Sequence, residues 1–94
     1  MDWPFDDPPN VITITSWKIL RGEDWIDFVS HDADDGGWQF HGHSGPTSMA
    51  EAAVVGLKTI VEHDSSVCEL HDLPLGWVAT RETQAGPWVR NPND

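Results

Sequence analysis

The stretch WIDFVSHDADDGGWQFH, residues 25–41, decides the fold of this chain. Residues 25–31 and 37–41 are rich in aromatic and β-branched side chains, which favour strands. The segment between them, residues 32–37, contains three Asp and two Gly. These residue types tolerate the backbone angles of a tight reversal. The stretch therefore predicts a β-hairpin.

The preceding segment predicts a strand followed by a short helix. Val11–Ile14 is β-branched throughout and favours an extended backbone. Thr15 or Ser16 can cap a helix over residues 17–21, which ends at a glycine. A single strand over residues 11–19 is the alternative, because apolar residues also alternate there.

The segment after the hairpin combines helical and extended signals. Ser48 and Glu51 fit a capping box, in which each side chain accepts a free backbone N–H of the other residue. Val54-Val55-Gly56 is a weak helical sequence. We therefore predict a short helix, a short strand and a second helix, with one unbroken helix over residues 49–63 as the alternative. These three elements are a short helix at 49–53, a strand at 54–56 and a helix at 57–63. They are followed by a capped turn from 64 to 70, a strand at 76–81 and a last strand at 86–90.

These elements predict an α+β domain with a mostly antiparallel sheet, an early β-hairpin and two or three short helices on one face. We expect an extended Pro/Asp-rich arm at residues 1–10, one domain at 11–90 and a tail at 91–94. The tryptophans at positions 17, 38 and 77 are assigned to the core. The full predicted core is Val11, Ile14, Leu20, Ile26, Phe28, Trp38, Phe40, Val55, Ile60, Val61, Leu70 and Trp77.

The charge of the chain limits its partners. Its 94 residues include 16 acidic and 5 basic side chains, which gives a net charge of −11. This charge repels nucleic acid and anionic membranes and favours a basic partner protein. No stretch is apolar enough to cross a bilayer, and we expect no signal peptide. The single cysteine, Cys68, agrees with a cytoplasmic location.

Two blocks of the sequence resemble a known family. They are HDADDGGWQF at residues 31–40 and DLPLGW at residues 72–77, within a resemblance that covers roughly residues 9–90. The family consists of small bacterial proteins with a domain of unknown function, grouped with the immunity proteins of polymorphic toxin systems. The resemblance implies a protein that binds and neutralises a partner protein. It supplies no catalytic residue to carry over.

The histidines and the Asp-rich turn are the candidates for a metal site. An EF-hand loop that began at Asp32 would have glycine at its fifth position and His43 at its twelfth, where a bidentate Glu is needed. A hairpin turn with exposed acids is the simpler interpretation. His31, His41 and His43 are weak candidates for zinc, because the ligand set is incomplete. We therefore expect no metal and no cofactor.

No residue pattern predicts catalysis. Cys68 lies next to acids, which raise a thiol pKa and make a poor nucleophile. Ser44 lacks the strand–turn–helix context of a hydrolase nucleophile. We therefore predict that the chain is not an enzyme.

Exposed tryptophan beside acidic residues is typical of a protein-binding patch, with an aromatic anchor inside a charged rim. We predict a non-enzymatic acidic interaction module of a bacterium, with the oligomeric state left open; the resemblance implies the immunity type. The alternatives are a nucleic-acid mimic that inhibits a DNA-binding enzyme, and a weak metal-binding domain. The predicted partner-binding residues are Trp3, Trp25, Asp27, Asp32, Asp34, Asp35 and Trp88.

Overall fold

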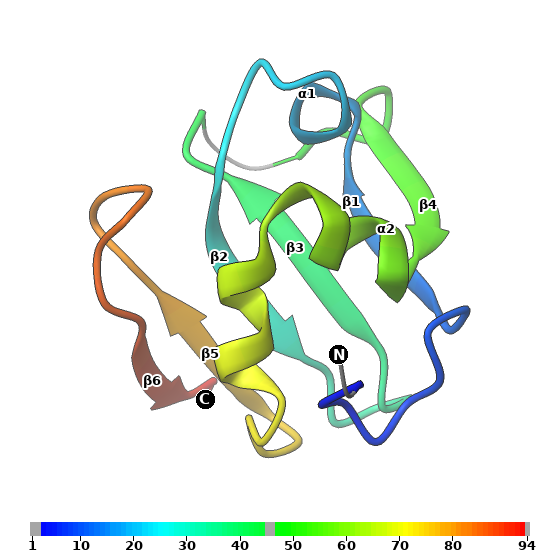
Figure 1. The fold of residues 1–94 in the computed structure, drawn as a ribbon, viewed down its shortest axis with the longest axis vertical. Coiled ribbons are helices and arrows are strands. Elements are labelled where there is room, and N and C mark those ends of the chain that lie inside the picture. Colours follow the sequence, from blue (N-terminus) through cyan, green and yellow to red (C-terminus); the bar gives the residue numbers. More distant parts are fainter. Residues whose placement is uncertain (1–2, 45–46, 94) are drawn as a thin grey trace.

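The computed structural model describes residues 3–44 and 47–93 and confirms a mixed α+β fold. One six-stranded sheet carries two α-helices and one 3-10 helix (Figure 1). In chain order the elements are β1 (Ile12–Ser16), α1 (Trp17–Leu20), β2 (Ile26–His31), β3 (Trp38–Gly42), β4 (Ala52–Gly56), α2 (Leu57–His63), the 3-10 helix η1 (Ser65–Leu70), β5 (Trp77–Thr80) and β6 (Val89–Pro92).

The sheet is mostly antiparallel. Its strand order is β4-β1-β3-β2-β5-β6, and among the described residues only the β1–β3 pair is parallel. Helix α2 and η1 lie across one face of this sheet (Figure 1). Strands β4 and β6 are the two edges, so each has a neighbour on one side only. No helix in the described ranges is long and apolar enough to cross a membrane.

The strand-then-helix prediction for the segment after residue 11 is confirmed, and the alternative of one long strand is wrong. Ser16 has an extended backbone, and its Oγ accepts a hydrogen bond from the Lys18 N–H at 3.1 Å. This cap satisfies a free amide and starts α1 at Trp17. The chain reverses at Gly22, whose φ of 77° is one that glycine adopts without strain.

The helix predicted at residues 49–53 is wrong, and so is the alternative of an unbroken helix to residue 63. The predicted capping-box segment forms only one turn, closed by the backbone N–H of Glu51, which donates to the Ser48 carbonyl at 3.0 Å. The chain then enters β4, which pairs along its whole length with β1. Tertiary pairing therefore overrides the helical propensity of the alanines. Helix α2 follows at the predicted position.

The core lies between the sheet and the helices that cover it. The predicted core residues Ile26, Trp38, Phe40, Ile60 and Leu70 are buried. Others are only half-buried, namely Val11, Leu20, Phe28, Val55, Val61 and Trp77. Buried apolar residues outside the prediction are Phe5, Ile19, Val29, Ala53, Leu57, Val67, Leu73 and Ala79.

Two core predictions, Ile14 and Trp17, are wrong. Ile14 is 39% exposed and Trp17 is 49% exposed, whereas Thr13 and Thr15 are buried. Strand β1 therefore turns its threonines toward the helices and its isoleucines toward the open face of the sheet. Thr13 is accommodated because its hydroxyl donates to the Val55 carbonyl at 2.9 Å. The sequence favours the opposite orientation, since apolar side chains normally face the core.

Both ends of the described chain pack against the domain. In the predicted arm, Phe5 is 5% exposed and belongs to the hydrophobic core. In the predicted tail, Asn91 and Pro92 continue β6, because they pair with Val78 and Trp77 of β5. Asp94, Met1 and Asp2 lie outside the described residues, as do positions 45–46 of the loop after β3.

Candidate functional site

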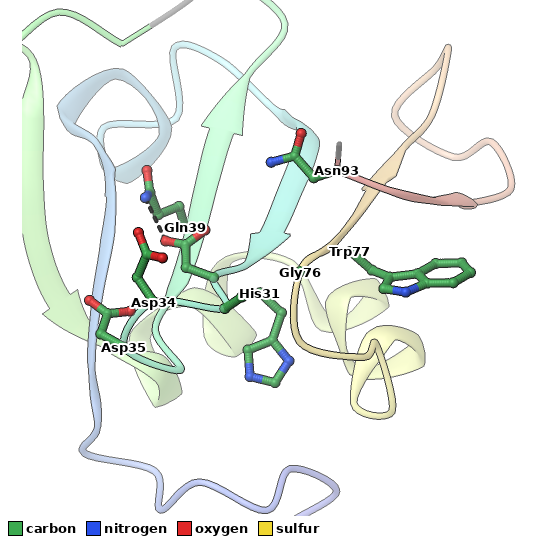
Figure 2. Close-up of a pocket in the computed structure, with 9 residues that line it drawn as sticks. His31, Asp34, Asp35, Gln39, Gly76, Trp77 and Asn93 are labelled. Atoms are coloured by element: carbon green, nitrogen blue, oxygen red, sulfur yellow. Dashed lines mark hydrogen bonds between the residues drawn. The ribbon is translucent and has the colours of Figure 1, made fainter.

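A hollow of about 450 Å³ opens where the β2–β3 turn meets the start of β5 and the end of β6. Figure 2 shows Asp34, Asp35 and Gln39 on one side of it, with Asn93 and Trp77 on the other. The lining residues are His31, Asp32, Ala33, Asp34, Asp35, Gln39, Gly76, Trp77 and Asn93.

The turn that carries the aspartates is closed by backbone hydrogen bonds. The Asp32 N–H donates to the Gly37 carbonyl at 2.7 Å, and the Gly36 N–H donates to the Asp32 carbonyl at 2.9 Å. Gly36 has a φ of 73°, which explains the glycine at this position. The Asp35 carboxylate accepts the Gly37 N–H at 2.8 Å. The turn therefore holds the three carboxylates at the end of the β2–β3 pair.

The opposite wall comes from the other end of the chain. The Gly76 N–H donates to the His31 carbonyl at 2.7 Å, and the Asn93 N–H donates to the Gly76 carbonyl at 2.8 Å. Gly76 has a φ of 80°, and a Cβ at this position would lie 3.6 Å from the Ala33 Cβ. That separation is ordinary van der Waals contact, so it is the positive φ, and not a lack of space, that favours glycine at this position of the DLPLGW block.

His31, which lines the hollow, is held by a stacked aromatic ring. The His31 ring lies parallel to the Trp38 ring at a centroid distance of 3.9 Å, and its Nδ1 donates to the Leu73 carbonyl at 2.7 Å. The Trp38 indole N–H donates to the Asp7 carboxylate at 2.9 Å, and Phe5 packs edge-on against the same indole. Phe5 and Asp7 of the N-terminal arm thus hold Trp38, which in turn stacks on His31.

The carboxylates of the hollow lack a basic partner among residues 3–44 and 47–93. Asp32 accepts a hydrogen bond from the Gln39 amide at 2.7 Å, whereas Asp34 and Asp35 are exposed. Elsewhere four of the five basic residues pair with other acids, in the ion pairs Lys18–Glu51, Arg21–Glu23, Arg81–Asp64 and Arg90–Asp72. The hollow is therefore electronegative and can accept a cationic side chain, with amides beside it as further hydrogen-bond groups.

The three histidines do not form a metal site. His31 bonds the Leu73 carbonyl, His41 lies between the Thr47 hydroxyl and the Gln39 amide, and His43 bonds the Asp27 carboxylate. Within the described part of the chain, no group of three His, Cys, Asp or Glu residues is placed to hold a metal ion. The physical reason is that His31 lies at the turn end of the β2–β3 pair, opposite Trp38, whereas His41 and His43 lie toward its other end, beside Phe28 and Trp25.

His41 gives the protein a pH-dependent stability. Burial lowers the pKa of His41, and the nearby Asp32 charge opposes this shift only in part. The unfolded chain therefore binds more protons near pH 6.5 than the folded chain does. Above that pH, His41 takes nothing from the free energy of unfolding. We expect the free energy of unfolding to decrease as the pH falls below it.

Urea denaturation at mildly alkaline and mildly acidic pH measures this effect. The variant His41→Gln should show a weaker dependence on pH across the same range, since the titrating ring is gone. A wild-type protein that becomes more stable on acidification, or a variant with an unchanged slope, would contradict the assignment.

The predicted partner-binding residues divide between the two ends of β2. Asp32, Asp34 and Asp35 line the hollow. Asp27 lies five residues from Asp32 along an extended strand, a separation of about 17 Å. Beside Asp27, the half-buried Trp25 stacks on His43 at a centroid distance of 4.6 Å. The predicted residues therefore do not make up one patch.

The three tryptophans predicted to bind a partner, Trp3, Trp25 and Trp88, are half-buried. The guanidinium of Arg81 lies 4.2 Å from the ring centroid of Trp88 and 5.8 Å from that of Trp25. Trp3 packs on Phe5, and its indole N–H donates to the Asp7 carbonyl at 2.6 Å. All three rings therefore have contacts within the chain, and Trp17 is the tryptophan that is exposed.

The residues considered for nucleophilic catalysis lie away from the hollow. Burial, together with the Asp64 charge, raises the pKa of the Cys68 thiol. A thiol with a raised pKa supplies little thiolate at neutral pH. Ser44 is exposed, and its backbone N–H donates to the Asp24 carboxylate at 3.1 Å.

Sequence reasoning missed half of the hollow. Gln39, Gly76, Trp77 and Asn93 were not considered as site residues, although Gly76 and Trp77 belong to a block that the resemblance singles out. Asn93 carries no sequence signal, because its position depends on the pairing of β6 with β5. The burial of Arg81 was also not predicted. Its position at the end of a predicted strand is the only feature of the sequence that sets this arginine apart.

The fold and the hollow define a small α+β domain with an acidic recess at one end of its sheet. Comparisons of the chain with protein-family models, with curated proteins and with solved structures found no match.

Proposed function

We propose that this chain is a non-enzymatic interaction module that binds a basic partner protein through the acidic hollow. The observation that carries the proposal is the set of three carboxylates around a 450 Å³ recess, with no basic side chain in the described ranges to neutralise them. A lysine or arginine of the partner would enter the recess and face the carboxylates of Asp32, Asp34 and Asp35. Arginine suits such a site because its planar fork can bond carboxylates and amides together.

The overall charge supports the same partner. A net charge of −11 on 94 residues gives a strong negative field around a small molecule. Such a field accelerates the approach of a basic protein and opposes the approach of nucleic acid. Binding should therefore weaken as salt increases, because salt screens the attraction.

The immunity-type role rests on the resemblance of HDADDGGWQF and DLPLGW to immunity-associated bacterial proteins. Both blocks contribute to the hollow, the first through Asp32, Asp34, Asp35 and Gln39 and the second through Gly76 and Trp77. In this role the module would bind a toxin protein inside a bacterium and block it. The residues that carry the family resemblance are thus the residues to which we assign partner binding.

Affinity capture with matched charge variants tests the hollow. The variant Asp34→Asn/Asp35→Asn removes two charges at exposed positions, and Glu62→Gln/Glu69→Gln removes two charges from exposed positions on α2 and η1. Wild type and the glutamine control should retain the same basic protein from nuclease-treated bacterial lysate at low salt and release it at high salt. The asparagine variant should lose it.

Equal retention by both variants would remove the hollow as the binding site. If no protein is enriched by the wild type in either salt condition, the interaction module itself is refuted. Competition with added DNA identifies the kind of protein captured, because only a DNA-binding enzyme held by a nucleic-acid mimic would be displaced.

A further inference from the structure

The two edges of the sheet differ in how they are protected. Strand β6 carries Arg90 and ends at Pro92, and charge and proline are common means of preventing edge-to-edge pairing. Strand β4 has the sequence AAVVG, with neither charge nor proline. In Figure 1 β4 forms one margin of the sheet. Strand β4 is therefore the unprotected edge.

The backbone of β4 presents regularly spaced hydrogen-bond groups at this edge. The Trp17 N–H donates to the Glu51 carbonyl at 2.8 Å, and the Leu57 N–H donates to the Val11 carbonyl at 2.9 Å. Together with the β1–β4 register, these bonds direct alternate residues of β4 toward β1. The N–H and C=O groups of Ala52, Val54 and Gly56 consequently point away from the sheet.

The side chains beside this edge are apolar and exposed. Val54 is 64% exposed, and Ile14 lies opposite it in the β1–β4 register with 39% exposure. Ile12, on the same face of β1, is 63% exposed. This apolar surface exists because β1 buries its threonines and turns its isoleucines outward. Contact with another strand would remove part of it from water.

The charges that flank β4 match a second copy of the same strand. Glu51 immediately precedes β4 and pairs with Lys18 of its own chain at 3.5 Å, in a pair that is partly exposed, and Lys58 follows β4 by two residues. An antiparallel pair centred on Val54 places the Glu51 end of one copy beside the Lys58 end of the other. A parallel pair would instead place like charges together. Lys58 is exposed and, within the described ranges, is the basic residue without an ion pair.

We propose that β4 pairs antiparallel with β4 of a second copy of this chain, which forms a two-fold symmetric dimer. At the axis, Val54 of each copy exchanges both backbone hydrogen bonds with Val54 of the other, and Ala52 lies opposite Gly56. The two six-stranded sheets then form one continuous sheet. The acidic hollows lie on the far side of each sheet, at β2, β3 and β5, so both remain open in the dimer.

The salt dependence of this dimer is opposite to that of partner binding. Each copy carries a net charge of −11, so the two copies repel each other at a distance. Salt screens this repulsion and leaves the backbone and apolar contacts intact. Dimerisation should therefore strengthen at high salt, whereas binding of a basic partner should weaken. The two proposals consequently fail independently.

Sedimentation velocity of the purified chain over a concentration series, at low and at high salt, tests the dimer. We expect a monomer–dimer equilibrium that shifts toward dimer at high salt. The variant Val54→Lys should raise the dimer dissociation constant by more than about tenfold, since it sets two like charges at the axis. The control Val89→Lys adds the same charge at a 55% exposed position on β6 and should dimerise like the wild type.

Charge reversal tests the antiparallel register separately from the edge. Lys58→Glu should weaken the dimer, and Glu51→Lys/Lys58→Glu should restore part of the affinity. Urea denaturation checks that each variant folds, and the exposed position of Val54 favours this. A wild-type chain that stays monomeric in all conditions, or a Val54→Lys variant that dimerises like the wild type, overturns the proposal.

Discussion

Replacing Arg81 with alanine is expected to lower the free energy of unfolding by about 3 kcal/mol or more. The side chain of Arg81 is 1% exposed and pairs with Asp64 at 2.5 Å. Its Nε donates to the Ile26 carbonyl at 2.8 Å and its Nη1 donates to the Ser66 hydroxyl at 2.9 Å. The guanidinium therefore joins η1 to β2, and its loss leaves a half-buried carboxylate and a carbonyl without their donor.

Urea denaturation of three variants separates the contributions at this site. Arg81→Lys keeps the charge but loses the planar fork, so it should also be clearly destabilised. Arg21→Ala removes a pair whose side chains are 57% and 58% exposed, and it should change stability by no more than about 0.5 kcal/mol. A loss below about 1 kcal/mol for Arg81→Ala would show that the Asp64 pair is not structural.

The same ion pair contributes to acid sensitivity. Burial alone would raise the pKa of Asp64, but hydrogen bonds from Ser66 and Arg81 and the charge of Arg81 together lower it. A carboxyl with a lowered pKa contributes stability above its unfolded pKa near 3.8 and loses this contribution as the pH falls further. Protonation of Asp64 is therefore expected to contribute to acid unfolding, at a lower pH than the loss at His41.

Replacing Trp38 with alanine is expected to cost about 3–5 kcal/mol, as for other buried tryptophans. Trp38 is 3% exposed and is surrounded by Phe5, His31 and Phe40. Its removal opens a large cavity under the hollow and releases the ring of His31. The variant Asp34→Asn/Asp35→Asn changes the charge of the hollow. Trp38→Ala instead removes the ring that stacks on His31, one of the residues that line the hollow.

Two further substitutions serve as controls for Trp38. Trp38→Phe keeps an aromatic ring but loses the hydrogen bond to Asp7, so it should cost markedly less than alanine. Trp17→Ala removes the same residue type from a position that is 49% exposed and should have a small effect. Similar losses for Trp17→Ala and Trp38→Ala in chemical denaturation would contradict the burial that separates them.

The candidate site was only partly visible in the sequence. The three aspartates of the turn were identifiable, because glycine and aspartate cluster between two apolar runs. Their surroundings were not, because Gly76 and Asn93 reach the turn through the pairing of β5 with β2 and of β6 with β5. The tryptophans show the same limit, since Trp25 and Trp88 meet at Arg81 only in the folded chain.

Local signals in the sequence determined the α+β class, the net charge of −11, the Ser16 cap of α1 and the position of α2. These properties depend on residues that are near one another along the chain. Tertiary structure alone decided that Ala52 and Ala53 join the strand predicted at residues 54–56, that Thr13 is buried while Ile14 is exposed, and that Arg81 lies in the core. Each of these outcomes depends on which face of a strand the helices cover and on which distant strand pairs with it. The spacing of residue types along the sequence does not reveal which face of a strand is covered or which distant strand pairs with it.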